Sequence, residues 1–284
     1  MKLGILGGSG LYQLAAIEQA EWRTVETPWG LPSDELLFGR VGETEVVFLP
    51  RHGRGHRLTP SEVPYRANIA ALKLAGCTHV LSVSACGSFR EELPPGMFVL
   101  VDQFIDRTRG RAKSFFGDGI VCHVGLADPT CARLADVAEA ALQTLGIPHR
   151  RGGTYLAMEG PQFSTRAESR LYRAAGLDVI GMTNMPEAAL AREAELHYQT
   201  VAMVTDYDSW REGSAVDVTD ILAVQAANAE NARRLVVEVA SRLGAASACE
   251  QGCDRALDHA ILTAPELRPI ATVERLRSVA GRVL

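Results

Sequence analysis

The sequence predicts an α/β fold, with one mixed β-sheet flanked by helices in a single domain. Short segments rich in Val, Ile and Leu alternate with helical patterns from the first residue to about position 243, an order typical of a sheet covered by helices. Hydrophobic residues make up 47% of the 284 residues and charged residues 22%. These fractions suit a globular core and exclude a disordered or collagenous chain.

Each expected strand is a short apolar cluster. The strands are predicted at Lys2–Leu6, Thr44–Pro50, Thr78–Ser84, Met97–Gln103, Gly153–Met158, Asp178–Met182 and Gln199–Thr205. Three helices have readable signals. Thr165 and Glu168 form a capping box, Pro186 occupies a favoured first-turn position, and an Ala-, Glu- and Arg-rich segment spans about 219–242.

Composition changes after Gly244. Residues 1–244 therefore form the predicted α/β domain, and residues 245–284 form a helical extension that packs on the same domain or on a neighbouring subunit. Cys249 and Cys253 would share one helix face, where they could hold a metal ion or form a strained disulfide. Two unpaired buried thiols are the more common arrangement.

Charge and targeting signals narrow the class of protein. The net charge of −5 gives no general attraction for nucleic acid or for an anionic membrane. The sequence contains no apolar run of roughly 18 residues, and its start lacks the features of a signal peptide, so we expect a cytoplasmic protein. The six cysteines are too sparse for a disulfide scaffold.

Polar and Gly-rich clusters follow the ends of the predicted strands, where ligands bind in α/β sheets. They are Gly7–Gly10, Arg51–Gly53, Ser84–Ser88, Glu159–Ser164, Met182–Asn184 and Asp206–Asp208. Six loops that meet at one sheet edge could enclose a single pocket.

Two of these clusters suit an anion. The Gly-rich turn around Ser9 could cradle a phosphate with backbone N–H groups and the Ser9 hydroxyl, and a tight turn without a ligand is the alternative. A dinucleotide site would need a third glycine where Gln13 stands. Arg51 and His52 form a local anion site in an acidic protein, whereas Arg54, His56 and Arg57 are expected in a solvated loop.

Asp206 and Asp208 follow a strongly apolar strand. Two carboxylates in one pocket resist double ionisation, so one can keep a proton and donate it to a leaving group. The same Asp-x-Asp spacing also occurs in metal sites and in turns. Phe163, in a Gly-Pro loop, could stack on a purine, but taken alone it is more typical of core packing.

The sequence resembles the methylthioadenosine phosphorylase family of the purine nucleoside phosphorylase superfamily, in order, from the N-terminus to about residue 243. The matching segments include Gly-Ile-Leu-Gly-Gly-Ser-Gly-Leu at 4–11, Arg-His-Gly-Arg-Gly-His at 51–56, Ala-Cys-Gly-Ser-Phe-Arg-Glu-Glu at 85–92, Glu-Gly-Pro-Gln-Phe-Ser at 159–164 and Thr-Asp-Tyr-Asp-Ser-Trp at 205–210. The resemblance implies a fold of the purine nucleoside phosphorylase type. It also implies phosphorolysis of 5′-methylthioadenosine to adenine and 5-methylthioribose 1-phosphate.

The resemblance also assigns roles. The residues that it places around phosphate are Ser9, Arg51, His52, Ser84, Ala85 and Thr183. Those that it places around the nucleoside are Phe163, Met182, Asp206, Tyr207 and Asp208, with Asp206 as the acid for adenine N7 and Asp208 as the acceptor for the 6-amino group. Ser164 and Val218 match positions associated with the choice of purine, and His123 matches the methylthio pocket.

The same resemblance implies a homotrimer, or a hexamer made of two trimers, with the C-terminal helix of a neighbouring subunit near the 5′ group. It implies no metal or organic cofactor, because inorganic phosphate is a co-substrate.

Two alternatives stay open at the level of sequence. One is a phosphorylase of relaxed or 6-oxopurine specificity, acting on methylthioinosine or inosine, which Asn184 permits because a threonine is common there. The other is a nucleoside-binding or dinucleotide-dependent protein, which the first Gly-rich turn suggests and the missing third glycine opposes.

Overall fold

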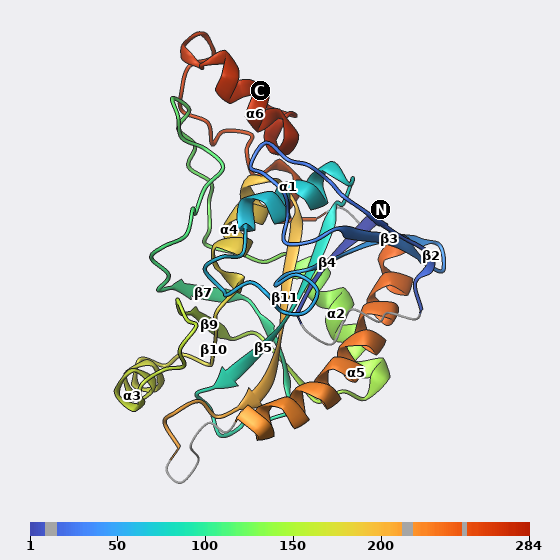
Figure 1. Cartoon of the computed structure of the whole chain (residues 1–284), viewed down its shortest axis with the longest axis vertical. Helices are drawn as coiled ribbons and strands as arrows, with labels where there is room; N and C mark the ends of the chain where they lie inside the picture. Colours follow the sequence, from blue (N-terminus) through green and yellow to red (C-terminus); the bar gives the residue numbers. More distant parts are fainter. Residues whose placement is uncertain (9–15, 212–217, 246–248) are drawn as a thin grey trace.

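In the part of the chain that the structure describes, the fold is built on one mixed sheet of 11 strands (Figure 1). The computed structural model describes residues 1–8, 16–211, 218–245 and 249–284, with the backbone alone for residues 218–221. The strands are β1 (Lys2–Gly7), β2 (Glu18–Arg23), β3 (Leu36–Val41), β4 (Thr44–Pro50), β5 (His79–Ser88), β6 (Phe98–Val101), β7 (Gln103–Asp106), β8 (His149–Arg151), β9 (Thr154–Ala157), β10 (Val179–Gly181) and β11 (His197–Asp206).

Helices are interspersed with these strands. The α-helices are α1 (Tyr65–Leu74), α2 (Ala132–Leu145), α3 (Arg166–Ala174), α4 (Asn184–Glu193), α5 (Val218–Arg242) and α6 (Ile270–Ala280). Three single turns of 3-10 helix are η1 (Leu243–Ala245), η2 (Cys253–Arg255) and η3 (Pro265–Leu267). Among the described residues, no helix combines the length and the apolar composition that a bilayer crossing requires.

β5 is the strand around which the sheet is organised. It pairs in parallel with β1 and β11, and its last residues pair antiparallel with β10. Because β1, β5 and β11 run in one direction, their C-terminal ends reach the same edge of the sheet, where ligands bind in α/β proteins.

Side chains alternate between the two faces of the sheet, as the pleat requires. Leu3 and Ile5 of β1 pack in a core with α2 and α5, whereas Leu6 packs in a second core with α1, α4 and α6. In Figure 1, α2 and α5 accordingly lie together on one side and α1 and α4 on the other. The predicted α/β fold is confirmed.

The three helix signals read from the sequence are confirmed. Thr165 accepts from the backbone N–H of Glu168, and the Glu168 carboxylate accepts from the N–H of Thr165, so α3 begins with the predicted capping box. In α4, Met185 has extended φ/ψ angles, so the regular helix begins at Pro186. The long helix α5 covers residues 218–242.

Several strands differ from the prediction. The expected strand Met97–Gln103 is two strands, β6 and β7, which pair with different neighbours. β2 and β3 were not predicted; β2 is a polar, largely exposed strand at the sheet edge, so it has no apolar alternation. β8 was also not predicted, and it holds only His149, Arg150 and Arg151.

The C-terminal extension packs against the body of the same chain. Leu257, Leu276 and Val279 are buried in the core that α1 and α4 share, and Cys122 forms a β-bridge with Ile261. Contact of the extension with a second subunit stays a prediction.

Candidate active site

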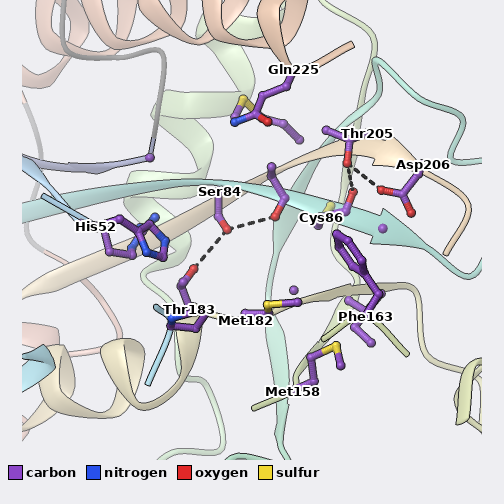
Figure 2. A pocket seen from close by; sticks show the side chains of 18 of the residues that line it. His52, Ser84, Cys86, Met158, Phe163, Met182, Thr183, Thr205, Asp206 and Gln225 are labelled. Atoms are coloured by element: carbon purple, nitrogen blue, oxygen red, sulfur yellow. Dashed lines mark hydrogen bonds between the residues drawn. The ribbon is translucent and has the colours of Figure 1, made fainter. Parts of the chain in front are cut away.

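A cavity of about 330 Å³ opens at the C-terminal ends of β5 and β11 (Figure 2). It brings together residues from loops that are far apart in the sequence. The predicted site residues that line it are Arg51, His52, Ser84, Ala85, Phe163, Met182, Thr183, Asp206 and Asp208.

Other predicted site residues lie elsewhere. Ser9 lies outside the described residues, and so does the side chain of Val218, the first residue of α5. Tyr207 packs edge-on against Trp210, and its hydroxyl donates to Glu91 O. Ser164 is buried behind the lining, with its Oγ 3.8 Å from Met158 Sδ.

His123 stands beside the C-terminal extension. Its backbone N–H donates to Ala260 O at 2.8 Å, and its side chain does not line the cavity of this single chain. A role at the 5′ end of the nucleoside therefore depends on a neighbouring subunit, and it stays a prediction.

Asp206 ends β11 at an irregularity in its pairing with β5. Its Oδ2 accepts from Thr205 Oγ1 at 2.7 Å and its Oδ1 accepts from the Asp208 N–H at 2.7 Å. Burial nevertheless raises the pKa of Asp206. Gly87 makes this position possible, because a Cβ there would stand 3.0 Å from Asp206 Oδ1 and 3.3 Å from Asp208 Cβ.

Asp208 adopts a φ of 50°, which non-glycine residues rarely do and which often marks functional sites. Burial raises its pKa, and the neighbouring charge of Asp206 adds to the effect, while the hydroxyls of Ser169 and Ser164 oppose it. Asp208 Oδ2 is buried and has no hydrogen-bond partner among the described residues. A buried acceptor of this kind is satisfied when a ligand brings a donor.

Arg51, at the other end of the cavity, is fixed by the protein itself. It is 1% exposed, and its Nε donates to Glu187 Oε2 at 2.8 Å. Its terminal nitrogens donate to Val83 O, Leu6 O and Ser82 Oγ. Most of the guanidinium donors are therefore already used, and the charge is balanced by a carboxylate.

Glu187 was missed by the sequence analysis. It is 1% exposed and also accepts from Ser82 Oγ at 2.6 Å and from the Tyr198 hydroxyl at 2.8 Å. The sequence feature that could have identified Glu187 is that it is an acidic residue directly before the alanines of a buried helix. Asn184 donates into the same network, at Ser82 and Thr200, and it does not line the cavity, so it is not placed to select the purine.

Neutral groups form the surface around Arg51. Ser84 Oγ and Thr183 Oγ1 lie 3.3 Å apart, and both line the cavity (Figure 2). His52 Nδ1 lies 2.9 Å from Leu58 O, which can only accept, so Nδ1 carries the proton. Burial lowers the pKa of His52 to about 4, so the ring is neutral near pH 7 and Nε2 has a free lone pair.

His56 is exposed, as expected for a solvated loop, and it also borders the cavity, where it stacks on His52 with ring centroids 4.3 Å apart. Phe163 is 52% exposed at the cavity, so the alternative of core packing is wrong, and its place beside the nucleoside stays a prediction. Arg54 behaves as expected, since it pairs with Asp34 at the surface.

Arg111 and Gln225 were also missed. Arg111 is buried and donates to Met182 O, Met185 O and Glu159 O, so it joins the two loops that carry Met182 and Phe163. Gln225 reaches the cavity from α5, as Figure 2 shows. Neither stands in a sequence motif, and the partners of Arg111 lie far along the chain.

The two ends of the cavity suit different chemistry. Hydroxyls and a neutral imidazole beside a buried Arg can hold an oxyanion. Buried carboxyls with raised pKa values can donate a proton or accept from a nitrogen base. Of the residues that the structure describes, one group of three or more His, Cys, Asp and Glu side chains is close enough to hold a metal ion, and it lies outside this cavity at Cys131, His197, Cys249 and Cys253.

Comparison with known proteins gives one consistent result. The model of the phosphorylase superfamily matches residues 2–241. The chain is 59% identical to the S-methyl-5′-thioadenosine phosphorylase of Cereibacter sphaeroides, over 99% of this chain and 98% of that protein, and 56% identical to that of Rhodospirillum rubrum, over 99% and 97%.

Solved structures agree. A methylthioadenosine phosphorylase from an antarctic soil metagenomic library superposes with a TM-score of 0.91 at 45% identity, covering 98% of each chain. The methylthioadenosine phosphorylase of Schistosoma mansoni in complex with adenine has a TM-score of 0.88 at 37% identity, covering 92% of this chain and 99% of that one.

Proposed function

The chain belongs to the phosphorylase superfamily, and on this premise we propose that it is a pentosyltransferase that cleaves 5′-methylthioadenosine with inorganic phosphate. The products are adenine and 5-methylthioribose 1-phosphate. The observation that carries the choice of base is the Asp206–Asp208 pair, whose pKa values are raised and whose Asp208 Oδ2 lacks a donor. The relatives at 59% and 56% identity support the same substrate.

The phosphate end positions the nucleophile. Hydroxyls of Ser84 and Thr183 donate to phosphate oxygens, and the neutral His52 ring accepts a hydrogen bond at Nε2 from a phosphate hydroxyl. Arg51 attracts phosphate through its positive charge and through its remaining N–H, and Glu187 fixes the position of the Arg51 side chain. A phosphate oxygen then attacks C1′ as the C1′–N9 bond breaks, and positive charge develops on the ribose in the transition state.

The leaving adenine, at the base end of the cavity, keeps the electron pair of the broken C1′–N9 bond. Asp206 supplies a proton to N7 of the leaving adenine, which a carboxyl with a raised pKa can do near neutral pH. Asp208 accepts from the 6-amino group. A 6-oxo group would instead face a carboxylate with its own lone pairs, so adenine is favoured over hypoxanthine.

The 5′ methylthio group needs an apolar environment. We assign it to His123 and the C-terminal extension of a neighbouring subunit, in a trimer or in a hexamer of two trimers. The reaction as proposed uses phosphate as co-substrate and no metal or organic cofactor, and it takes place in the cytoplasm.

The decisive experiment measures adenine release from the purified protein with 5′-methylthioadenosine, with and without phosphate. Parallel reactions use 5′-methylthioinosine, adenosine and inosine. We expect phosphate-dependent cleavage, fastest with 5′-methylthioadenosine. Faster cleavage of the inosine-type substrates would contradict the roles of Asp206 and Asp208, and release without phosphate would contradict phosphorolysis itself.

A further inference from the structure

Three thiols and an imidazole converge at the end of β11 opposite to Asp206. Cys131 immediately precedes α2, His197 is the first residue of β11, and Cys249 and Cys253 belong to the C-terminal extension. Each residue offers one ligand atom, and these four atoms all lie within 4.8 Å of one another. Since β11 has ten residues, this cluster is roughly 30 Å from the base end of the cavity.

Three of the separations are close to those of a tetrahedral zinc site. Cys131 Sγ lies 3.7 Å from Cys249 Sγ and 3.4 Å from His197 Nδ1, and Cys249 Sγ lies 3.5 Å from Cys253 Sγ. Tetrahedral Zn²⁺ with ordinary bond lengths to sulfur and nitrogen places two sulfurs about 3.8 Å apart and a sulfur and a nitrogen about 3.6 Å apart. A disulfide would need sulfurs at about 2 Å, and it would leave the imidazole without a role.

The backbone brings these ligands together in advance. The N–H of Cys131 donates to Tyr198 O at 2.8 Å, which ties the start of α2 to the start of β11. Gly252 has a φ of 59°, and its N–H donates to Cys249 O at 3.0 Å, so a tight turn directs both thiols of the extension to one side. The His197 ring stacks on His79 with centroids 4.5 Å apart, which orients it.

Burial indicates what kind of site this is. Cys131 and Cys253 are 1% and 2% exposed, while His197 and Cys249 are half-buried and border a surface cavity through which an ion can enter. Four protein ligands fill a tetrahedral coordination shell and leave no position for a substrate, which is typical of a structural site and not of a catalytic one.

We propose that Cys131, His197, Cys249 and Cys253 bind one structural Zn²⁺ that fastens the C-terminal extension to the α/β body. The three thiols bind as thiolates and release their protons to water, and the imidazole binds in its neutral form. On this proposal, Cys249 and Cys253 are metal ligands and not the two unpaired thiols that the sequence analysis favoured. It does not depend on the proposed reaction, and it adds no metal to the catalytic cavity.

The first test is the zinc content of the full-length protein without an affinity tag, measured by plasma mass spectrometry after incubation with Zn²⁺ and desalting. We expect about one zinc per chain. Cys253→Ala should weaken zinc retention about tenfold or more. Cys77→Ala is the matched control, because Cys77 is also 2% exposed but lies outside the cluster, and it should keep its zinc.

A second measurement needs no variant. Co²⁺ bound in place of Zn²⁺ should give thiolate-to-metal charge-transfer absorption and the visible bands of a tetrahedral ion. Wild-type protein without zinc and without these bands would overturn the proposal. Equal zinc in wild type and Cys253→Ala, or a disulfide within the cluster detected by peptide mass mapping, would overturn it as well.

Discussion

The charged groups at the proposed phosphate end of the cavity have partners in the protein, whereas those at the proposed base end have no ion-pair partner among the described residues. Arg51 is paired with Glu187 at 2.8 Å, and most of its donors already bind protein acceptors. Asp206 and Asp208 form no ion pair with any described residue, and Asp208 Oδ2 has no partner. The Arg51 charge is therefore balanced within the protein, whereas Asp208 Oδ2 is left open to a donor from a ligand. Removing the partner of Arg51 should reduce stability, and changing the two aspartates should reduce activity.

The largest effect is expected from Glu187→Ala. Removing this carboxylate leaves the Arg51 charge buried and unpaired, which costs about 3–5 kcal/mol of unfolding free energy. Denaturant unfolding followed by circular dichroism measures the loss. Glu187→Gln, which keeps hydrogen bonds to Ser82 and Tyr198, serves as the control and should lose less. If Glu187→Ala lowers the unfolding free energy by less than about 1 kcal/mol, the Arg51–Glu187 ion pair contributes little to stability.

Asp206→Asn should mainly affect catalysis. Without its proton donor, kcat/KM for 5′-methylthioadenosine should fall about 100- to 1,000-fold, while the KM for phosphate and the unfolding midpoint stay near wild type. The remaining activity should shift toward inosine-type substrates, because an amide can donate to a 6-oxopurine. Steady-state kinetics with both nucleosides measures this, and unchanged relative rates would remove Asp206 from the base site.

His52 should make stability depend on pH. Its folded-state pKa of about 4 is below the ordinary value of 6.5, so the unfolded chain binds a proton more readily, and stability falls as pH falls through 6.5 toward 4. Between pH 7.5 and pH 5 this group should remove about 2 kcal/mol. His52→Gln should lose correspondingly less over that range in urea unfolding, and equal losses in the two proteins would contradict a buried neutral imidazole.

Asp208→Asn tests the acceptor that lacks a partner. It should reduce the preference for 6-amino over 6-oxo nucleosides about 10- to 150-fold, because a hydrogen bond to a charged group is worth about 1.5–3 kcal/mol. Because the buried carboxylate is replaced by a neutral amide, the unfolding free energy should stay level or rise. A clear loss of stability would show that Asp208 is satisfied within the protein.

The smallest effect is expected from Ser84→Ala. One hydroxyl donor contributes about 0.5–1.5 kcal/mol, so the KM for phosphate should rise about three- to tenfold with little change in the nucleoside KM. Arg51→Ala is a less clear test, because it would leave Glu187 buried without its partner. Equal changes in both KM values for Ser84→Ala would contradict a local phosphate role.

Much of this arrangement could be predicted from the sequence, because apolar strands and their polar C-terminal ends leave local signals. β1, β4, β5 and β11 were predicted in this way, and so were the Asp206–Asp208 pair and Arg51. The edge strand β2 was not, because exposed polar residues carry no alternation.

The remaining site residues have partners that are distant along the chain. Glu187 is 136 positions from Arg51, so neither residue predicts the ion pair alone. The same limit applies to the proposed zinc ligands, because Cys249 and Cys253 are close in the sequence while Cys131 lies 118 positions from Cys249. Sequence patterns identify the candidate reactive residues, but the partners that position them can be identified only from the folded structure.

The pairing of β5 with β11 has a consequence for how the protein is made. His79 and His197 start two strands that lie side by side, although more than a hundred residues separate them. Parallel neighbours so far apart form late, because a long loop must close before any contact is gained. During synthesis on the ribosome, β5 therefore emerges long before its neighbour, with one edge open to other chains. The catalytic cavity is then among the last parts of the nascent protein to form.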